Sequence, residues 1–238
     1  MKDLFEKKKR SPSKPEPLAV RMRPRDLREF VGQGHILGPG KLLTRAIEAD
    51  TIASLVLYGP PGTGKTTLAH VVSNATKAEF VPLNATVSNV QELRKEIEAA
   101  KQRRMLYDKK TILFVDEIHR FNKAQQDVLM PDVEAGVVIL IGATTYNPFF
   151  SIVAPLISRS LVFELKPLSV ADIIKVLHNA LKDKDRGLGS IRINIENKAL
   201  EFLARLSEGD ARRALNGLEL AALTTQKSKD GAVNITLQ

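Results

Sequence analysis

Nine residues decide the fold, Gly59-Pro60-Pro61-Gly62-Thr63-Gly64-Lys65-Thr66-Thr67. An apolar run at residues 55–58 precedes them, and apolar residues with helical spacing follow from Leu68. A strand, a glycine-rich turn and a helix start are the parts of a phosphate-binding loop. The glycines let backbone N–H groups surround phosphate oxygens, and the helix N-terminus adds partial positive charge. The alternative is a glycine-rich surface turn, and the flanking strand and helix argue against it.

Each residue of this loop is a candidate nucleotide ligand. Lys65 is expected to reach the β- and γ-phosphates of ATP, and the Thr66 hydroxyl to hold Mg²⁺. The loop residues in question are Gly59, Pro60, Pro61, Gly62, Thr63, Gly64, Lys65, Thr66 and Thr67.

A second apolar run, at residues 111–115, ends in the carboxylates Asp116 and Glu117. Parallel strands are continuously apolar and place functional groups at their carboxyl ends. Asp116 therefore lies where a Mg²⁺ ligand is needed, and Glu117 is positioned to polarise a water against the γ-phosphate. The alternative for this acidic pair is a helix N-cap.

Strands alternate with helices along most of the chain, which predicts an α/β P-loop domain with a mainly parallel sheet. Further strands are expected at 79–84, 137–141 and 161–165, and helices at 41–49, 88–105 (with Ser88 as the N-cap) and 123–130. After residue 166 the pattern predicts only helices, at 170–181, 196–206 and 211–224. We therefore expect a tail at 1–17, an ATPase domain at 18–166 and a small all-helical lid at 167–238.

Composition narrows the function classes. The 238 residues include no Cys, which excludes disulfides, thiolate metal sites and Cys nucleophiles. The longest apolar run is too short to span a bilayer, so we expect a cytoplasmic, nucleoid-associated protein with no membrane part. The net charge of +9 favours a polyanionic partner, nucleic acid first, although a basic surface serving only solubility is the alternative. Part of the excess lies at residues 7–10.

Several smaller features have two interpretations. Leu4-Phe5 is an apolar pair in a polar tail, either a short docking peptide or a pair without a role. Arg212-Arg213 open the last helix, where they oppose the helix dipole, so they indicate an external anion or are simply solvated. The histidines show no metal-ligand spacing, and His119 is a minor candidate for sensing the nucleotide because it follows the acidic pair.

The motifs GPPGTGKTT, FVDEIH, GATT, SRS and GDARRAL, in that order, resemble an AAA+ ATPase with a helical lid. The resemblance covers about residues 18–222 and narrows to the replication-associated recombination protein A family, also called MgsA, whose eukaryotic relative is the Werner-helicase-interacting ATPase. It rests on PLAVRMRPRDLREFVGQGHILGPGKLL, DEIHRFNKAQQDVLMPDVEAG, IGATTYNPFF and EGDARRALNGLELA. Clamp-loader subunits and the RuvB branch-migration motor are similar more distantly.

The resemblance implies a role for residues outside the phosphate loop. Thr145 matches the sensor at the end of a strand, and Arg159 the arginine finger that serves ATP on a neighbouring subunit. Arg212 matches the lid arginine that reads the γ-phosphate. Three residues match the loop that covers the adenine, namely Val31, Gly32 and Gln33. The implied cofactors are ATP or ADP with Mg²⁺, held by Thr66 and Asp116.

The sequence departs from the family pattern at three points. Tyr146 replaces a Glu, Ser160 replaces a Cys, and the chain stops at Gln238, where the family continues with an oligomerisation domain. We therefore expect the homo-oligomer in the full-length protein, and the sequence leaves the oligomeric state of this chain open.

The expected function is DNA-stimulated, oligomer-dependent ATP hydrolysis at stalled or damaged replication forks, with single-strand–duplex junctions or DNA ends as partners. The alternative is a nucleotide-switched module of clamp-loader type that docks to replication proteins such as a clamp or a single-strand-binding protein. A protein-remodelling ATPase ranks last because residues 85–89 carry no aromatic side chain.

Overall fold

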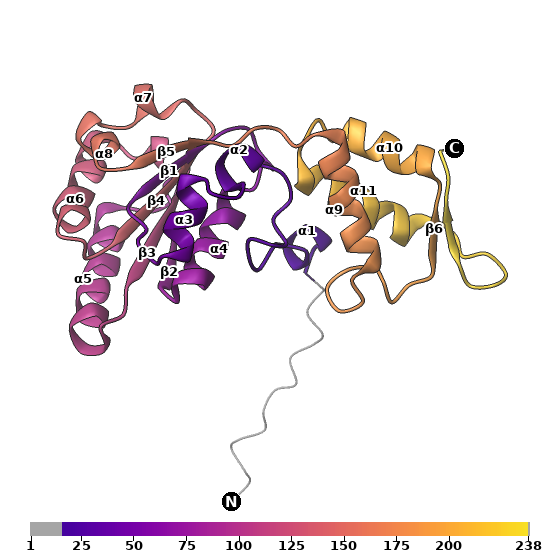
Figure 1. The fold of residues 1–238 in the computed structure, drawn as a ribbon, viewed down its shortest axis with the longest axis horizontal. Helices are drawn as coiled ribbons and strands as arrows, with labels where there is room; N and C mark the ends of the chain where they lie inside the picture. The colour runs from indigo at the N-terminus through magenta and orange to yellow at the C-terminus, as the bar shows by residue number, and fades with distance from the viewer. Residues whose placement is uncertain (1–15, 238) are drawn as a thin grey trace, which may run out of the picture.

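The computed structural model describes residues 16–237, so Leu4-Phe5 and the basic run at 7–10 lie outside the described residues. The larger part of the molecule is a five-stranded parallel sheet with strand order β2-β3-β4-β1-β5 (Figure 1). The strands are β1 (Leu55–Tyr58), β2 (Glu79–Asn84), β3 (Thr111–Asp116), β4 (Ile139–Thr144) and β5 (Leu161–Glu164). The expected α/β P-loop fold is therefore confirmed.

The register of this sheet brings the functional segments to one edge. Tyr58, the last residue of β1, lies opposite Thr144, the last residue of β4. Asp116 ends β3 next to β4, and Val115 lies opposite Gly142. The phosphate loop after β1, the acidic pair after β3 and the threonines after β4 therefore leave the sheet side by side.

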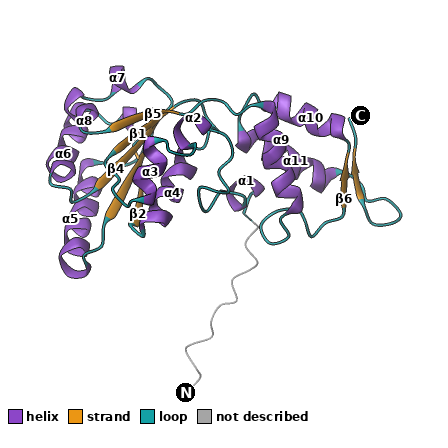
Figure 2. Ribbon diagram, in the orientation of Figure 1, coloured by secondary structure: helices purple, strands orange, loops and turns teal. Residues whose placement is uncertain are grey.

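Helices cover both faces of the sheet (Figure 2). Alternation along β1 turns Leu55 and Leu57 toward one face and Val56 toward the other, and all three are buried. The first face packs against α3 (Leu42–Glu48) and α4 (Lys65–Thr76). The second packs against α5 (Val90–Tyr107), α6 (Lys123–Glu134) and α8 (Ala154–Ser158).

Three helices form the lid, α9 (Val170–Lys182), α10 (Asn197–Leu206) and α11 (Ala211–Thr224). They enclose a second core, and Leu18 of α1 (Leu18–Arg21) is buried in it. Figure 1 shows α1 beside the lid helices. The lid is not all helical, because β6 (Ile193–Ile195) and β7 (Val233–Ile235) pair in parallel. The domain boundaries remain a prediction, with α1 packed on the lid side.

Three local expectations are corrected. Helix α5 is capped by Asn89, not Ser88, because the Asn89 side chain accepts from the Glu92 N–H at 2.9 Å. Helix α6 runs through Pro131 to Glu134, and Val133 beyond the proline still packs on the core. Strand β4 covers residues 139–144 rather than 137–141, since its last four residues pair with β1.

The remaining helical segments are short. They are α2 (Gly34–Leu37), the 3-10 turn η1 (Ile118–Arg120) and α7 (Pro148–Ser151). Within residues 16–237, no helix has the length and apolar character needed to cross a membrane.

Candidate nucleotide-binding site

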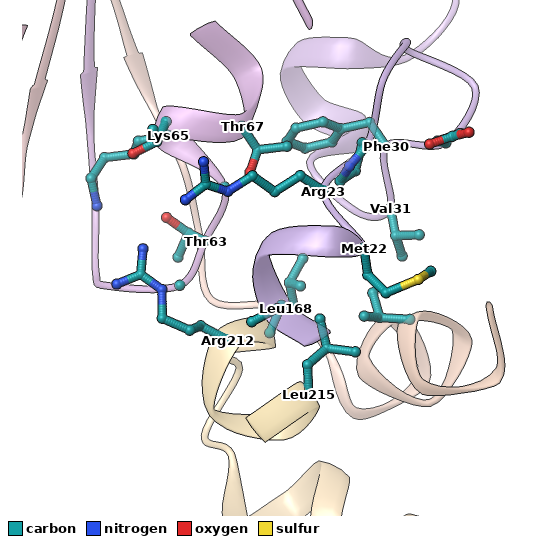
Figure 3. Close-up of a pocket in the computed structure, with 18 of the residues that line it drawn as sticks. Met22, Arg23, Phe30, Val31, Thr63, Lys65, Thr67, Leu168, Arg212 and Leu215 are labelled. Atoms are coloured by element: carbon teal, nitrogen blue, oxygen red, sulfur yellow. The ribbon is translucent and has the colours of Figure 1, made fainter. Parts of the chain in front are cut away.

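A cavity of about 540 Å³ lies between the sheet edge and the lid (Figure 3). The phosphate loop from Pro61 to Thr67 lines one side, together with Asp116, Glu117 and Thr145. The opposite side is formed by α11, which contributes Arg212, and by the segment that follows α1. In Figure 3 the side chains of Lys65 and Arg212 point into the same space beside Thr63.

Glycines shape the phosphate loop where no other residue fits without strain. Gly59, Gly62 and Gly64 have φ angles of +146°, +70° and +101°, a region that side chains rarely adopt. A Cβ on Gly64 would lie 2.8 Å from the Phe30 ring, and one on Gly62 would lie 2.8 Å from Cα of Asp210. Gly64 is also the N-cap of α4, so the 12-residue helix points its N-terminus into the cavity.

Lys65 is the cation of the loop. Its side chain is buried, and Nζ donates to the carbonyl oxygens of Gly59 and Pro60 at 2.7 and 2.8 Å. Burial lowers the pKa of Lys65, and the nearby carboxylates of Glu117 and Asp116 oppose that shift. Gly59 and Pro60 do not line the cavity wall. Their carbonyl oxygens instead hold the Lys65 ammonium in place.

The acidic pair is held by an unusual backbone turn. Asp116 ends β3, and its Oδ1 accepts from the Glu117 N–H at 3.1 Å. Glu117 has φ +53° and precedes η1, yet its side chain makes no cap hydrogen bond. The N-cap alternative therefore fails for Glu117, whose side chain faces the cavity instead.

The donor set fits ATP with one Mg²⁺. Thr66 offers a hydroxyl and Asp116 a carboxylate at the same wall, which suits a Mg²⁺ ion that keeps waters and phosphate oxygens as its other ligands. Within residues 16–237 there is no cluster of three or more His, Cys, Asp and Glu side chains that would hold a metal alone. The glycine cradle, the buried ammonium of Lys65 and the end of α4 complement phosphate charge.

Only one residue of the segment Val31-Gly32-Gln33 lies at the cavity. Val31 lines the cavity, whereas Gly32 and Gln33 do not. The buried Gln33 amide donates to the Thr63 and Lys166 carbonyls at 3.3 and 2.7 Å, and its oxygen accepts from the Lys166 N–H at 3.0 Å. Gln33 therefore joins the phosphate loop to the lid connection with its side chain.

Arg159 lies away from this cavity. It follows α8, its side chain is 42% exposed, and it forms an ion pair with Glu134 at 2.7 Å. It also donates to the Pro155 carbonyl at 2.9 Å. Arg159 and Arg213 therefore do not line the cavity, whereas Thr145 and Arg212 do, and Arg213 pairs with Glu208 at 2.8 Å.

The apolar wall of the cavity was not predicted from the sequence. Met22, Phe30, Leu168 and Leu215 line it together with Val31 (Figure 3). An apolar wall suits a nucleobase. Arg23 also lines the cavity, and Figure 3 shows its guanidinium directed toward the Lys65 side. These residues come from three separate segments, so neither spacing nor periodicity could have grouped them.

A parallel sheet of this strand order, a glycine-rich loop opening a helix, an acidic pair on the neighbouring strand and a lid arginine define a P-loop ATPase of the AAA+ class. Residues 22–159 match the family model described as the Holliday junction DNA helicase RuvB P-loop domain, and residues 189–238 match an AAA C-terminal domain. The RuvB Holliday junction branch migration motor of Thermotoga maritima has a similar structure, with a TM-score of 0.70 and 28% identity, over 91% of this chain and 70% of that one.

Sequence relatives narrow the family. Replication-associated recombination protein A of Escherichia coli K12 is 50% identical over 207 residues, which is 87% of this chain and 46% of the relative. ATPase WRNIP1 of Dictyostelium discoideum is 40% identical over 86% of this chain and 23% of its own length. The chain belongs to the AAA+ ATPase family of replication-associated recombination protein A and WRNIP1. It spans about half the length of the bacterial relatives it matches.

Proposed function

We propose that this chain binds ATP with Mg²⁺ and hydrolyses it to ADP and phosphate. The observation that carries the proposal is the meeting of Lys65, the Asp116–Glu117 pair and the lid residue Arg212 around one cavity. Phosphoryl transfer needs positioning and charge stabilisation more than covalent chemistry, and this set of side chains supplies both.

The residues that line the cavity have different proposed roles in binding and hydrolysing ATP. The loop amides and Lys65 bind the phosphates, and the apolar wall with Val31 holds the base. Thr66 and Asp116 hold Mg²⁺, which neutralises phosphate charge when bound. Glu117 orients the attacking water and polarises it. Thr145 and Arg212 contact the γ-phosphate from the sheet and from the lid.

Arg159 supports the proposal that hydrolysis depends on assembly. It lies outside the cavity of its own chain and is exposed beside Glu134, which suits a residue that reaches the ATP of a neighbouring subunit. Such an arginine contributes about 10³–10⁵ in rate in phosphoryl transfer enzymes. Hydrolysis should then rise more steeply than protein concentration.

DNA is the proposed partner, and replication-associated recombination or repair at stalled or damaged forks is the proposed role. The net charge of +9 supports contacts with the phosphate backbone. The names of the relatives point to replication-associated recombination and to Holliday junctions. We therefore expect stimulation by single-strand–duplex junctions or ends, with single-strand-binding or clamp proteins as further partners.

Steady-state ATP hydrolysis at a series of protein concentrations tests this function. The assay is run without DNA, with duplex and with a single-strand–duplex junction, and Lys65→Ala serves as the control that cannot engage the phosphates. We expect activity that is stimulated by the junction and rises steeply with protein concentration. Tight ATP binding without turnover at any concentration would instead support the nucleotide-switched docking module.

A further inference from the structure

Four side chains form a cluster between the acidic pair and the end of β4, namely Glu117, His119, Thr144 and Tyr146. Nδ1 of His119 lies 2.9 Å from Oγ1 of Thr144 and 3.3 Å from Oε2 of Glu117. The Tyr146 ring packs edge-on against the His119 ring, with centroids 4.6 Å apart, and the Tyr146 N–H donates to Oγ1 of Thr144 at 3.1 Å. This cluster therefore links the acidic pair to the end of β4.

The cluster contains two buried polar atoms without a hydrogen bond. They are Oε2 of Glu117 and Nε2 of His119. A buried polar atom without a partner is costly, most of all when it belongs to a charged group. Nδ1 of His119 lies 3.3 Å from Oε2, and Thr144 Oγ1 competes for the same nitrogen at 2.9 Å.

These contacts decide which ring nitrogen of His119 carries the proton. A proton on Nε2 would leave a buried N–H without an acceptor, and the Nδ1 lone pair would then face the Glu117 carboxylate. A proton on Nδ1 points toward two oxygens and leaves only a lone pair at Nε2. Burial lowers the pKa of His119, with Glu117 opposing the shift, which agrees with a neutral ring.

We propose that His119 is a positioning residue for Glu117, whose single Nδ1–H is shared between Oε2 of Glu117 and the Thr144 hydroxyl. The proposal rests on the hydrolysis proposed above. When the N–H turns to Glu117, Oε2 is anchored and Oε1 is left to face the water in the cavity. When the N–H stays with Thr144, the carboxylate is not anchored.

This sharing gives the end of β4 control over the general base. Thr144 is buried, and the next residue, Thr145, lines the cavity where the terminal phosphate is expected. A small shift of Thr145 on phosphate contact moves Thr144 with it through the backbone. The shift lengthens one hydrogen bond of His119 and favours the other, so the phosphate controls the orientation of Glu117.

The first test needs no nucleotide. ¹⁵N NMR of the imidazole nitrogens reports the tautomer of His119, assigned by comparison with His119→Asn. We expect a neutral ring protonated at Nδ1. A ring protonated at Nε2 would overturn the proposal, because Nδ1 would then have no proton to share.

The second test separates orientation from binding. His119→Asn keeps an N–H donor near the Nδ1 position, whereas His119→Ala removes it. We expect ATP turnover to fall about tenfold or more in His119→Ala and to recover in His119→Asn to within about threefold of wild type, since hydrogen bonds to charged groups are strong. ATP affinity and melting temperature should change little in either variant. His70→Asn is the matched control, because His70 packs on Phe80 outside the cavity.

A double variant that combines Glu117→Gln with His119→Ala tests whether His119 acts through Glu117. If His119 acts through Glu117, adding His119→Ala to Glu117→Gln should not lower turnover further. Full activity in His119→Ala, beside an inactive Glu117→Gln, would overturn the His119 proposal and leave the hydrolysis proposal intact. Failure of the wild-type chain to bind ATP at any concentration would overturn both the hydrolysis proposal and the His119 proposal.

Discussion

Gly62 joins the phosphate loop to the lid, and Gly62→Ala tests that contact. Gly62 has φ +70°, and an added Cβ would overlap the Asp210 carboxylate and lie 2.8 Å from its Cα. Asp210 is the N-cap of α11, where its Oδ1 accepts from the Arg213 N–H at 3.0 Å. The Gly62 carbonyl also accepts from the Ala211 N–H at 3.3 Å. The added methyl group must therefore displace the start of the helix that carries Arg212.

The expected loss of stability in Gly62→Ala has two main contributions. Alanine with positive φ costs about 1–2 kcal/mol, partly offset because alanine restricts the unfolded chain. Loss of the Asp210 cap adds about 1 kcal/mol. Gly231→Ala is the matched control, since Gly231 has φ +79° and no heavy atom within 4 Å of the added Cβ. Gly62→Ala should therefore be less stable than Gly231→Ala by at least the loss of the cap, about 1 kcal/mol, or about 2–4 °C in melting temperature for a chain of this size.

Calorimetry and titration with a fluorescent ATP analogue measure the two effects. Gly62→Ala should melt below Gly231→Ala and bind nucleotide at least tenfold more weakly, because Arg212 moves with α11. Equal melting temperatures and unchanged affinity in the two variants would refute the contact between the phosphate loop and the lid.

Three further predictions concern other parts of the structure. Arg159→Ala should keep ATP affinity while turnover falls by about 10³ or more. Arg205→Ala is the control, because it breaks only an exposed ion pair with Glu201 at 2.8 Å within α10, and it should leave turnover unchanged. Equal activity in both variants would exclude Arg159 as an arginine finger. Gln33→Ala removes the side-chain partner of the Lys166 N–H and carbonyl, whose hydrogen bonds to Gln33 are partly buried. It should lower the free energy of unfolding by about 1–3 kcal/mol, as measured by denaturant titration. Hydrogen bonding to Arg186 lowers the pKa of Glu29 below its ordinary 4.5, so its stabilisation is present above pH 4.5 and is lost as the pH falls through the folded-state pKa. Glu29→Gln should therefore be less stable than wild type near pH 7 by about 0.2–1 kcal/mol, a small effect because the side chain is 37% exposed. The difference in stability between the two proteins should narrow in acid. A difference that widens in acid would contradict the lowered pKa of Glu29.

Local patterns in the sequence predicted much of the fold. The apolar runs at β1 and β3 are continuous because both faces of those strands are buried, and the glycines of the phosphate loop are fixed by backbone geometry. Asp116 ends the second run, and Lys65 begins the helix after the loop that follows the first run, so the centre of the site was predictable from the strands.

Features that depend on distant partners were not predictable in this way. Strands β6 and β7 have three residues each and pair across about 40 positions, too short to give a periodic signal. The Gln33 side chain turns inward only because Thr63 and Lys166 are there to receive it. The capping choice between Ser88 and Asn89 depends on one position of register, which helical spacing does not resolve.

Glu117 is proposed to drive hydrolysis in a cavity that binds ATP without its help. Affinity for ATP and steady-state turnover, measured side by side for wild type and Glu117→Gln, test it most directly. The amide keeps the size of the side chain and removes its charge, so we expect ATP affinity within a few-fold of wild type and a collapse of turnover. Turnover that survives in Glu117→Gln would contradict the claim and assign the water to another residue.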